Sequence, residues 1–239
     1  MDKKDLLKEP VRDMHLSRNS TLKELMDQFS ESGGFTSAKI STAFAILKKM
    51  FTEENTTFLS FPADIISTGT RGIINELVKR KMVDVIITTT GTLDHDVART
   101  YGRYYSGTFD FSDRKLADLG INRLGNVFVP DESYGELIEE KIQAMLADLY
   151  EEKKEWSGTE LLKRIGLRIE DESSILYNAA RNNIYHGKKI VRLASEGKLS
   201  GAKLEEAISW RKIREDAEFV NLYGDITVIL PILIGSLLD

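Results

Sequence analysis

The chain of 239 residues contains no cysteine. It can therefore form no disulfide, bind no metal through thiolates and use no cysteine nucleophile. This absence is consistent with a cytoplasmic location, which we expect for the protein. The net charge is −5, so the chain lacks a basic stripe of the kind that nucleic-acid-binding proteins carry, and no nucleic-acid partner is expected.

Long apolar runs and sorting signals are missing too. The longest apolar run, residues 226–238, is shorter than the roughly 20 residues that a membrane-spanning helix needs, so we predict a buried terminal helix. The first ten residues, MDKKDLLKEP, are too charged for a secretory signal. No membrane partner is therefore expected.

The usual nucleotide-binding and metal-binding motifs are also absent. Neither G-x-G-x-x-G nor G-x-x-x-x-G-K-[ST] occurs. The histidines His15, His95 and His186 are too scattered for a metal site, so no metal is expected. His95, flanked by Asp94 and Asp96 just after a predicted strand, suits a solvated loop or a functional position.

The sequence does contain an alternation of helix and strand patterns. Apolar residues at helical spacing predict helices over residues 36–51 (capped by Thr36 or Ser37), 67–82, 132–150 and 158–183 (with a break near Gly166). Apolar and β-branched runs predict strands over residues 56–61, 83–90, 123–130 and 219–223. This alternation is typical of the α/β class, with a mainly parallel sheet covered by helices on both faces. We expect a single domain over residues 1–239, in which residues 1–33 form an N-terminal helical extension.

Small polar residues follow two of the predicted strands. Ser67, Thr68 and Gly69 come after the first strand, and residues 88–92 after the second. In open α/β sheets, ligands gather at the carboxyl ends of strands, where helix amino termini offer free N–H groups to phosphate. The same residues also suit well-capped turns that bind nothing, and periodicity alone does not separate these interpretations.

The segment EEAISWRK, residues 205–212, leaves a similar alternative open. If this segment is helical, Lys212 lies on one stripe with Leu204 and Ile208. A lysine on the apolar side of a helix can extend its ammonium group to water. Alternatively, burial lowers its pKa, and the neutral amine can then attack a carbonyl or an imine.

Four stretches carry a resemblance to a known family: STGTRGIINELVKRKMVDVIITTTG, LGINRLGNVFVP, SGAKLEEAISWRKI and YGDITVILP. The chain resembles deoxyhypusine synthase in its archaeal or bacterial form over residues 34–184 and 199–238, in the same order. The resemblance implies a Rossmann-like fold, NAD as cofactor and a homotetramer built as a dimer of dimers, with active sites between paired subunits. The implied substrates are spermidine and a lysine of the hypusine-containing translation factor.

The resemblance also implies the chemistry. NAD takes a hydride from a spermidine carbon to give an imine, which an enzyme lysine attacks with release of diaminopropane. The aminobutyl group then passes from the enzyme lysine to the translation-factor lysine and is reduced by the stored NADH. The family lysine lies in a W-G-K element that matches residues 210–212, so the resemblance assigns Lys212 as the nucleophile.

Further site residues are implied one by one. The family's NAD-binding positions match Asp64, Ile65, Ser67, Thr89, Thr90, Gly91, Asp225 and Ile226. Its polyamine-binding glutamate and tryptophan match Glu206 and Trp210, and the acidic pair after the second strand matches Asp94 and His95. Carboxylates and an aromatic face are the expected host for a flexible polyamine cation.

This sequence departs from the family pattern in four places. Asp64 stands where the family usually has asparagine, His95 replaces an acidic residue, and Arg211 replaces the glycine before the lysine. Between about residues 185 and 198, YHGKKIVRLASEGK replaces a longer family segment with a polyamine-contacting histidine that His186 does not match. Either the chain is a shortened paralogue, or the sequence has lost a segment that the functioning protein contains.

Two alternatives to aminobutyl transfer onto the translation factor therefore stay open. Because His95 replaces an acidic residue, the acceptor could be a small amine, as in homospermidine formation. Because the central segment is short and Arg211 is bulky, the chain could instead be a non-catalytic paralogue that pairs with an active subunit.

Overall fold

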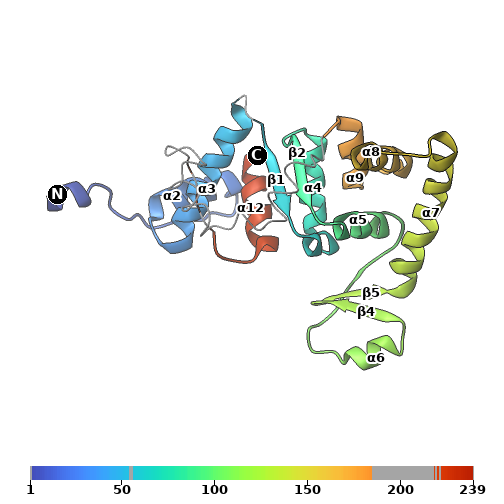
Figure 1. The fold of residues 1–239 in the computed structure, drawn as a ribbon. Helices are drawn as coiled ribbons and strands as arrows, with labels where there is room; N and C mark the ends of the chain where they lie inside the picture. Colours follow the sequence, from blue (N-terminus) through green and yellow to red (C-terminus); the bar gives the residue numbers. More distant parts are fainter. Residues whose placement is uncertain (1, 54–55, 185–217, 219, 221, 239) are drawn as a thin grey trace. The chain divides into compact units, whose positions relative to one another are not determined.

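The computed structural model describes residues 2–53, 56–184, 218, 220 and 222–238 (Figure 1). The chain forms two compact units, which we call the terminal unit (Met1–Asn55 with Gly197–Asp239) and the central unit (Thr56–Glu196). Helices dominate the described residues, and five short strands among them form two small sheets. The predicted α/β class is confirmed.

The terminal unit is helical in the part that the structure describes. It contains α1 (Lys3–Leu6), α2 (Leu22–Ser32), α3 (Phe35–Thr52) and α12 (Ile226–Leu238). A capping box begins α2: Thr21 Oγ1 accepts from the N–H of Glu24 at 3.1 Å, and the Glu24 carboxylate accepts from the N–H of Thr21 at 2.9 Å. The three longer helices bury a shared core, which consists of Met26, Ile40, Ala43 and Leu233.

The start of α3 corrects a prediction. The helix begins at Phe35 after Gly34, whose extended backbone forms the N-cap, so the predicted caps Thr36 and Ser37 were wrong. The Ser37 hydroxyl donates backwards to the Gly34 carbonyl oxygen at 2.5 Å instead of accepting from the helix. Both residues lie inside the first turn.

The end of the chain was predicted in part. The terminal helix is confirmed as α12, in which Leu233 and Ile234 are buried while Val228 is exposed. No helix in the described part of the chain is both long and apolar enough to cross a membrane. The predicted strand over residues 219–223 is wrong where the structure describes it, because Val220 and Leu222 pack against the terminal-unit core without joining a sheet.

A parallel pair of strands organises the central unit. β1 (Phe58–Phe61) pairs with β2 (Val85–Thr88), and the connection between them consists of the 3₁₀ helix η1 (Ala63–Ser67) and α4 (Thr70–Lys79). The first three residues of β2, Val85 to Ile87, are all buried, as the β-branched run predicted for a strand with both faces covered. Directly after β2, α5 (Gly91–Tyr101) begins.

Three further helices complete the core of the central unit: α7 (Gly135–Glu152), α8 (Gly158–Ile169) and α9 (Ile175–Asn182). Together with α5 they form one cluster of buried residues, which consists of Val97, Met145, Leu149, Ile165, Ile169 and Leu176. The predicted break near Gly166 was wrong, because Gly166 lies inside α8 and the chain turns later, at Glu170 with φ 52°. A Cβ at Gly166 would lie 2.7 Å from the Leu176 carbonyl oxygen, so this glycine allows α8 and α9 to approach closely.

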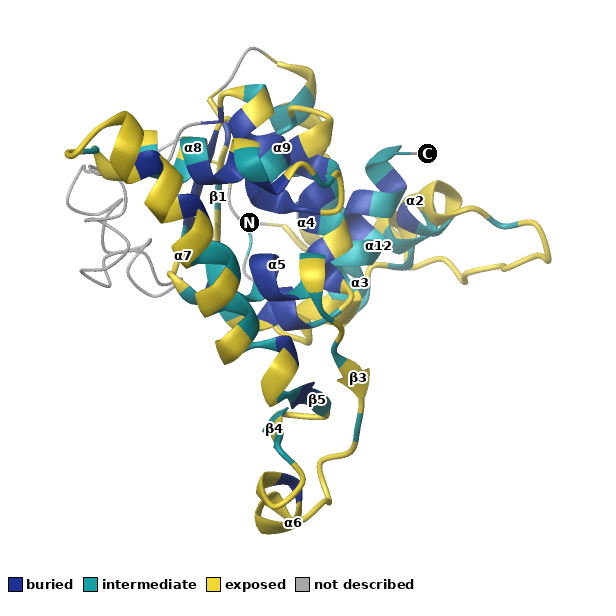
Figure 2. Ribbon diagram, turned by 90° about the vertical axis from the view of Figure 1, so that its right-hand side faces the viewer, coloured by how far each residue is buried: buried dark blue, intermediate teal, exposed yellow. Residues whose placement is uncertain are grey.

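Between α5 and α7 the chain forms a small separate feature that we call the arm, residues 105–130. It contains β3 (Tyr105–Ser106), α6 (Asp113–Ala117), β4 (Ile121–Leu124) and β5 (Val127–Pro130), and its antiparallel sheet has the order β3-β5-β4. The arm extends away from the helices of the central unit (Figures 1 and 2). The single strand predicted over residues 123–130 is a hairpin that turns at Gly125, with φ 61°.

Candidate functional site

The ends of the two parallel strands bring both predicted cofactor stretches together. Phe61 and Thr88 are register partners, so η1 and α5 begin at the same edge of the sheet. A Cβ at Gly91 would lie 3.0 Å from Ala63 Cβ, which is tighter than an ordinary contact. Gly91 therefore lets the start of α5 approach the start of η1.

Hydroxyl groups fix this edge. Thr88 Oγ1 donates to the Phe61 carbonyl oxygen at 2.8 Å and lies 2.5 Å from Thr92 Oγ1. Thr92 is buried in the first turn of α5. One side chain thus links the ends of both strands to the helix that follows.

The exposed groups at this edge suit a ligand that carries both phosphate and hydroxyl groups. Thr89, Thr90 and Asp64 are exposed, and no side chain caps the amino terminus of α5, where Thr90 is the N-cap residue. The N–H groups of Thr92 and Leu93 donate to the carbonyl oxygens of Thr89 and Thr90, at 3.0 and 2.9 Å, so it is the dipole of α5 and the threonine hydroxyls that attract an anion here. A carboxylate accepts from hydroxyls. Ile65 and Ser67 contribute differently, because both are buried and the Ser67 hydroxyl donates to the Asp64 carbonyl oxygen at 2.6 Å.

His95 lies on α5 and is half-buried, so the expectation of a solvated loop was wrong. Its Nδ1 lies 2.8 Å from the Tyr104 hydroxyl, and its ring centroid lies 5.3 Å from that of Tyr134. Burial lowers the pKa of His95, an effect that Asp94 partly opposes. The imidazole is therefore neutral at pH 7, between two tyrosines.

Asp94 borders an apolar cavity of about 180 Å³. The other residues that line it are Leu93, Val97, Ile138, Ile142, Leu162, Ile165 and Leu176. Burial raises the pKa of Asp94, and His95 partly offsets this effect. A single carboxyl group in an apolar wall can hold a cation whose chain is itself apolar.

The position of Asp94 leads to a first prediction. Since burial raises its pKa above the ordinary value of 3.8, the protonated form stabilises the fold below that pH, and this contribution is lost as the pH rises through the folded-state pKa. We therefore expect Asp94→Asn to raise the free energy of unfolding at pH 7 relative to the wild type, and to raise it less at pH 4.5. Urea unfolding at both pH values measures the difference. Asp148→Asn, on the exposed face of α7, is the control and should leave the free energy of unfolding unchanged at both pH values. Equal free energies of unfolding for Asp94→Asn and the wild type at pH 7 would contradict the prediction.

The neighbouring Asp96 has a structural role. Its buried carboxylate accepts from Arg71 Nε at 2.8 Å, from the Ser174 hydroxyl at 2.8 Å, and from the backbone N–H groups of Ile175 at 3.1 Å and Leu176 at 2.9 Å. These bonds join α5 to α4 and to the amino terminus of α9. Because the Asp96 carboxylate accepts from all four of these donors, we assign it no role toward a ligand.

Three residues of the site were missed from the sequence: Arg99, Tyr104 and Tyr134. Arg99 donates to the carbonyl oxygens of Ile66, at 2.8 Å, and of Thr68, and so holds the end of η1 against α5. Its position four residues after His95 places it on the same helix face, which the sequence could have shown. The two tyrosines come from either side of the arm, and no local pattern connects them with His95.

The remaining predicted site residues are not among the described residues of the central unit. Glu206, Trp210 and Lys212 lie outside the described residues. Asp225 and Ile226 belong to the terminal unit, where Asp225 Oδ1 accepts from the N–H of Thr227 at 2.8 Å and from its hydroxyl at 2.7 Å. These two bonds lower the pKa of Asp225, and they cap the start of α12.

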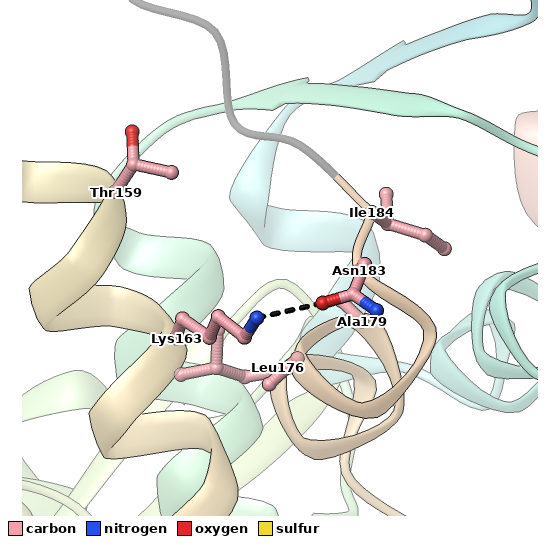
Figure 3. Close-up of a pocket in the computed structure, with 7 residues that line it drawn as sticks. Thr159, Lys163, Leu176, Ala179, Asn183 and Ile184 are labelled. Atoms are coloured by element: carbon pink, nitrogen blue, oxygen red, sulfur yellow. Dashed lines mark hydrogen bonds between the residues drawn. The ribbon is translucent and has the colours of Figure 1, made fainter.

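A second, smaller pocket of about 60 Å³ lies between α8 and α9 (Figure 3). It is lined by Thr159, Lys163, Leu176, Ala179, Ala180, Asn183 and Ile184. Lys163 Nζ donates to Asn183 Oδ1 at 2.6 Å across its mouth, and Lys163 is exposed. This lysine ties the end of α9 to α8 and is not a buried amine of the kind that forms imines.

Comparison with known proteins points to one family. A family model described as "DS: Deoxyhypusine synthase" matches residues 24–185 and 191–237. Curated relatives named "Probable deoxyhypusine synthase" from Picrophilus torridus and Thermoplasma acidophilum are each 50% identical over 310 residues, which cover 100% of both chains. A relative of the same name from Sulfolobus acidocaldarius is 33% identical over the same extent.

A solved structure from Entamoeba histolytica that carries the same family name matches the fold with a TM-score of 0.61. The match covers 95% of this chain and 96% of that chain at 16% sequence identity, so it concerns the fold alone. The alignments to the curated relatives span 310 positions, whereas this chain has 239 residues, so those relatives contain residues without a counterpart here. The family-model match is interrupted between residues 185 and 191, inside the segment where the sequence departs from the family pattern.

Proposed function

Because the chain belongs to the deoxyhypusine synthase family, we propose that it transfers the aminobutyl group of spermidine to a lysine of the hypusine-containing translation factor, with NAD as cofactor. The observation that carries this proposal is the meeting of both predicted cofactor stretches at one sheet edge, next to a half-buried carboxyl group and a neutral histidine. We further propose a cytoplasmic homotetramer, built as a dimer of dimers.

The proposed cofactor site fits the groups that line the strand ends. NAD, when bound, supplies the hydride acceptor that converts a spermidine amine to an imine. The uncapped start of α5 with Thr89 and Thr90 would hold its pyrophosphate, and the Asp64 carboxylate would accept from a ribose hydroxyl. Gly91 keeps this edge free of a side chain. The family resemblance adds Ile65, Ser67, Asp225 and Ile226 to the same role.

The proposed amine site is built around Asp94 and His95. The apolar cavity beside Asp94 suits a chain of methylene groups, and the carboxylate suits the ammonium group that ends it. His95, whose ring lies between Tyr104 and Tyr134, accepts or donates a hydrogen bond without adding a positive charge. The family resemblance adds Glu206 and Trp210 to this site, as a carboxylate and an aromatic face for the polyamine.

Lys212 is the proposed nucleophile. Its neutral Nζ attacks the imine carbon, both bonds from that carbon to the departing nitrogen break, and diaminopropane leaves with the two protons that the lysine nitrogen loses. The aminobutyl group stays on Lys212 as an imine. The amine of the acceptor lysine then displaces Lys212 by the same exchange in reverse.

Trapping of the lysine imine tests the proposed function. The wild-type chain is incubated with spermidine that is labelled in its aminobutyl part, with NAD, and then with borohydride, which reduces an imine to a stable amine. We expect one labelled peptide that contains Lys212, and no label when NAD is left out. Label on another lysine, or none on a folded chain that binds NAD, would contradict the proposed mechanism.

A second function keeps this chemistry but uses a small amine as the acceptor. The neutral imidazole of His95, in place of an acidic residue, favours it, because one negative charge fewer faces the polyamine. In a competition between putrescine and the translation factor for the trapped aminobutyl group, transfer to putrescine alone would select this function.

A non-catalytic member that pairs with an active subunit is the third candidate. It is favoured by the 310-residue alignments, because the relatives contain residues that this chain lacks. Calorimetric titration with NAD separates it from both enzymes, since the paralogue is expected to release no heat of binding. Binding in the micromolar range would exclude it.

A further inference from the structure

The arm exposes more large apolar side chains than its small size can bury. The exposed ones among its residues are Tyr105, Phe109, Phe111, Leu119 and Leu124. Phe109 and Leu119 are 66% and 69% accessible, and the arm is mostly exposed in Figure 2. A concentration of this kind on a protruding element marks a contact surface.

Contacts within the arm hold these side chains in place. Arg123 donates to both carboxylate oxygens of Asp113, at 2.7 and 3.1 Å, and to the carbonyl oxygens of Phe109 at 3.1 Å and Gly125 at 3.0 Å. Phe111 packs edge-on against Phe128, with ring centroids 6.0 Å apart. The Phe109 ring lies over the hairpin turn, because a Cβ at Gly125 would touch it at 3.4 Å.

This fixed geometry matters for binding. A surface whose side chains are already ordered loses little conformational entropy when a partner covers it. The four hydrogen bonds of Arg123 tie the Phe109 carbonyl group to the start of α6 and to the hairpin turn, so the backbone that carries this exposed ring is held in place. The arm is therefore preorganised for contact.

The charges of the segment from Arg103 to Asp131 indicate what that partner is. Four basic residues (Arg103, Arg114, Lys115 and Arg123) are balanced by four acidic ones (Asp110, Asp113, Asp118 and Asp131). A nucleic acid or another highly charged partner would favour one sign. A surface that carries both signs around apolar side chains is complementary to itself when two copies meet across a two-fold axis.

We infer that the arm is a self-association surface, through which two copies of this chain pair arm to arm. The inference rests on the proposed homo-oligomer and names the part of the chain that forms one of its interfaces. The buried centre of that interface is the aromatic face around Phe109 and Phe111, and the charged residues of α6 lie at its rim.

Sedimentation velocity of the full chain and of the Phe109→Ser/Leu119→Ser double variant tests the inference. We expect the wild type to sediment as an oligomer and the double variant to sediment with half its mass, because the two most exposed apolar side chains of the arm are lost. Tyr150→Ser, which removes an exposed aromatic residue from α7, is the matched control and should keep the wild-type mass. The circular dichroism of all three chains should agree, since each substituted side chain is exposed.

The possible outcomes separate this inference from the proposed function. A wild-type chain that sediments as a monomer overturns both the arm interface and the proposed oligomer, and an oligomeric double variant of unchanged mass overturns the arm interface alone. Because the chain has no cysteine, Phe109→Cys adds a single thiol, and oxidation should join two copies covalently. If Phe109→Ser/Leu119→Ser halves the mass but Phe109→Cys does not cross-link, pairing of one arm with another is wrong. None of these measurements requires spermidine or NAD.

Discussion

Asp96→Ala is expected to lower the free energy of unfolding by about 3–5 kcal/mol, the loss typical of a buried ion pair from which one partner is removed. The Asp96 side chain is 1% exposed and that of Arg71 is 8% exposed, so the variant leaves a guanidinium group without its carboxylate in the core. It also leaves the N–H groups of Ile175 and Leu176 without the acceptor that begins α9. Urea unfolding of the full chain, followed by circular dichroism, measures the loss.

Asp113→Ala is a matched control for this variant. The bond from Arg123 Nε to Asp113 Oδ1 is 2.7 Å long, close to the 2.8 Å of the Arg71–Asp96 pair, but the Asp113 side chain is 72% exposed. Water replaces its contacts, so little change in the free energy of unfolding is expected. A double variant, Arg71→Met/Asp96→Leu, should recover part of the stability that Asp96→Ala loses, because it leaves no unpaired charge. Equal losses from Asp96→Ala and Asp113→Ala would contradict the structural role of Asp96.

Lys212→Ala is expected to reduce aminobutyl transfer by about a thousandfold or more, the scale of loss when a covalent nucleophile is removed. Without the amine, no enzyme imine forms, so the borohydride-trapped label should disappear as well. Lys212→Arg should fail equally, since a guanidinium group stays protonated and cannot attack the imine. Single-turnover transfer from labelled spermidine to the translation factor measures the effect.

Two controls distinguish a lost nucleophile from a damaged chain. Lys49→Ala removes an exposed lysine that pairs with Glu218 in the terminal unit, and it should keep full transfer. Calorimetric titration of Lys212→Ala with NAD should give the wild-type affinity, because the proposed cofactor residues are untouched. If Lys212→Ala still becomes labelled, another lysine is the nucleophile and the family assignment of residues 210–212 does not hold for this chain.

The elements with strong local patterns could be predicted from the sequence. The β-branched run of β2 and the apolar spacing of α4 and α7 depend on neighbouring residues only, and these elements are present as predicted. The hairpin of the arm was missed because the apolar residues on both sides of Gly125 read as one strand unless its φ of 61° is known. The break predicted near Gly166 was wrong because glycine lowers helix propensity only modestly. Here the glycine lies inside α8, where its missing side chain lets α9 approach closely, and the sequence does not show that contact.

The candidate site could be predicted only in part. The meeting of the two polar stretches that follow β1 and β2 could be predicted because parallel strands end at one edge of their sheet. The roles of Asp94 and Asp96 were not separable, since residues two positions apart on a helix point in directions roughly 200° apart, and the sequence does not show which direction faces the core. Tyr104 and Tyr134 reach His95 only through the tertiary fold.

The Asp96 bonds also bear on how the chain is made. Asp96 precedes the α9 groups that donate to it by 78 to 80 residues. On the ribosome, its carboxylate emerges well before those donors, and closing so long a loop is slow. Until Leu176 has been synthesised, the side of α5 that carries Val97 lacks its α9 neighbour in the nascent chain, and apolar surface that is incompletely covered is open to aggregation or to capture by a chaperone.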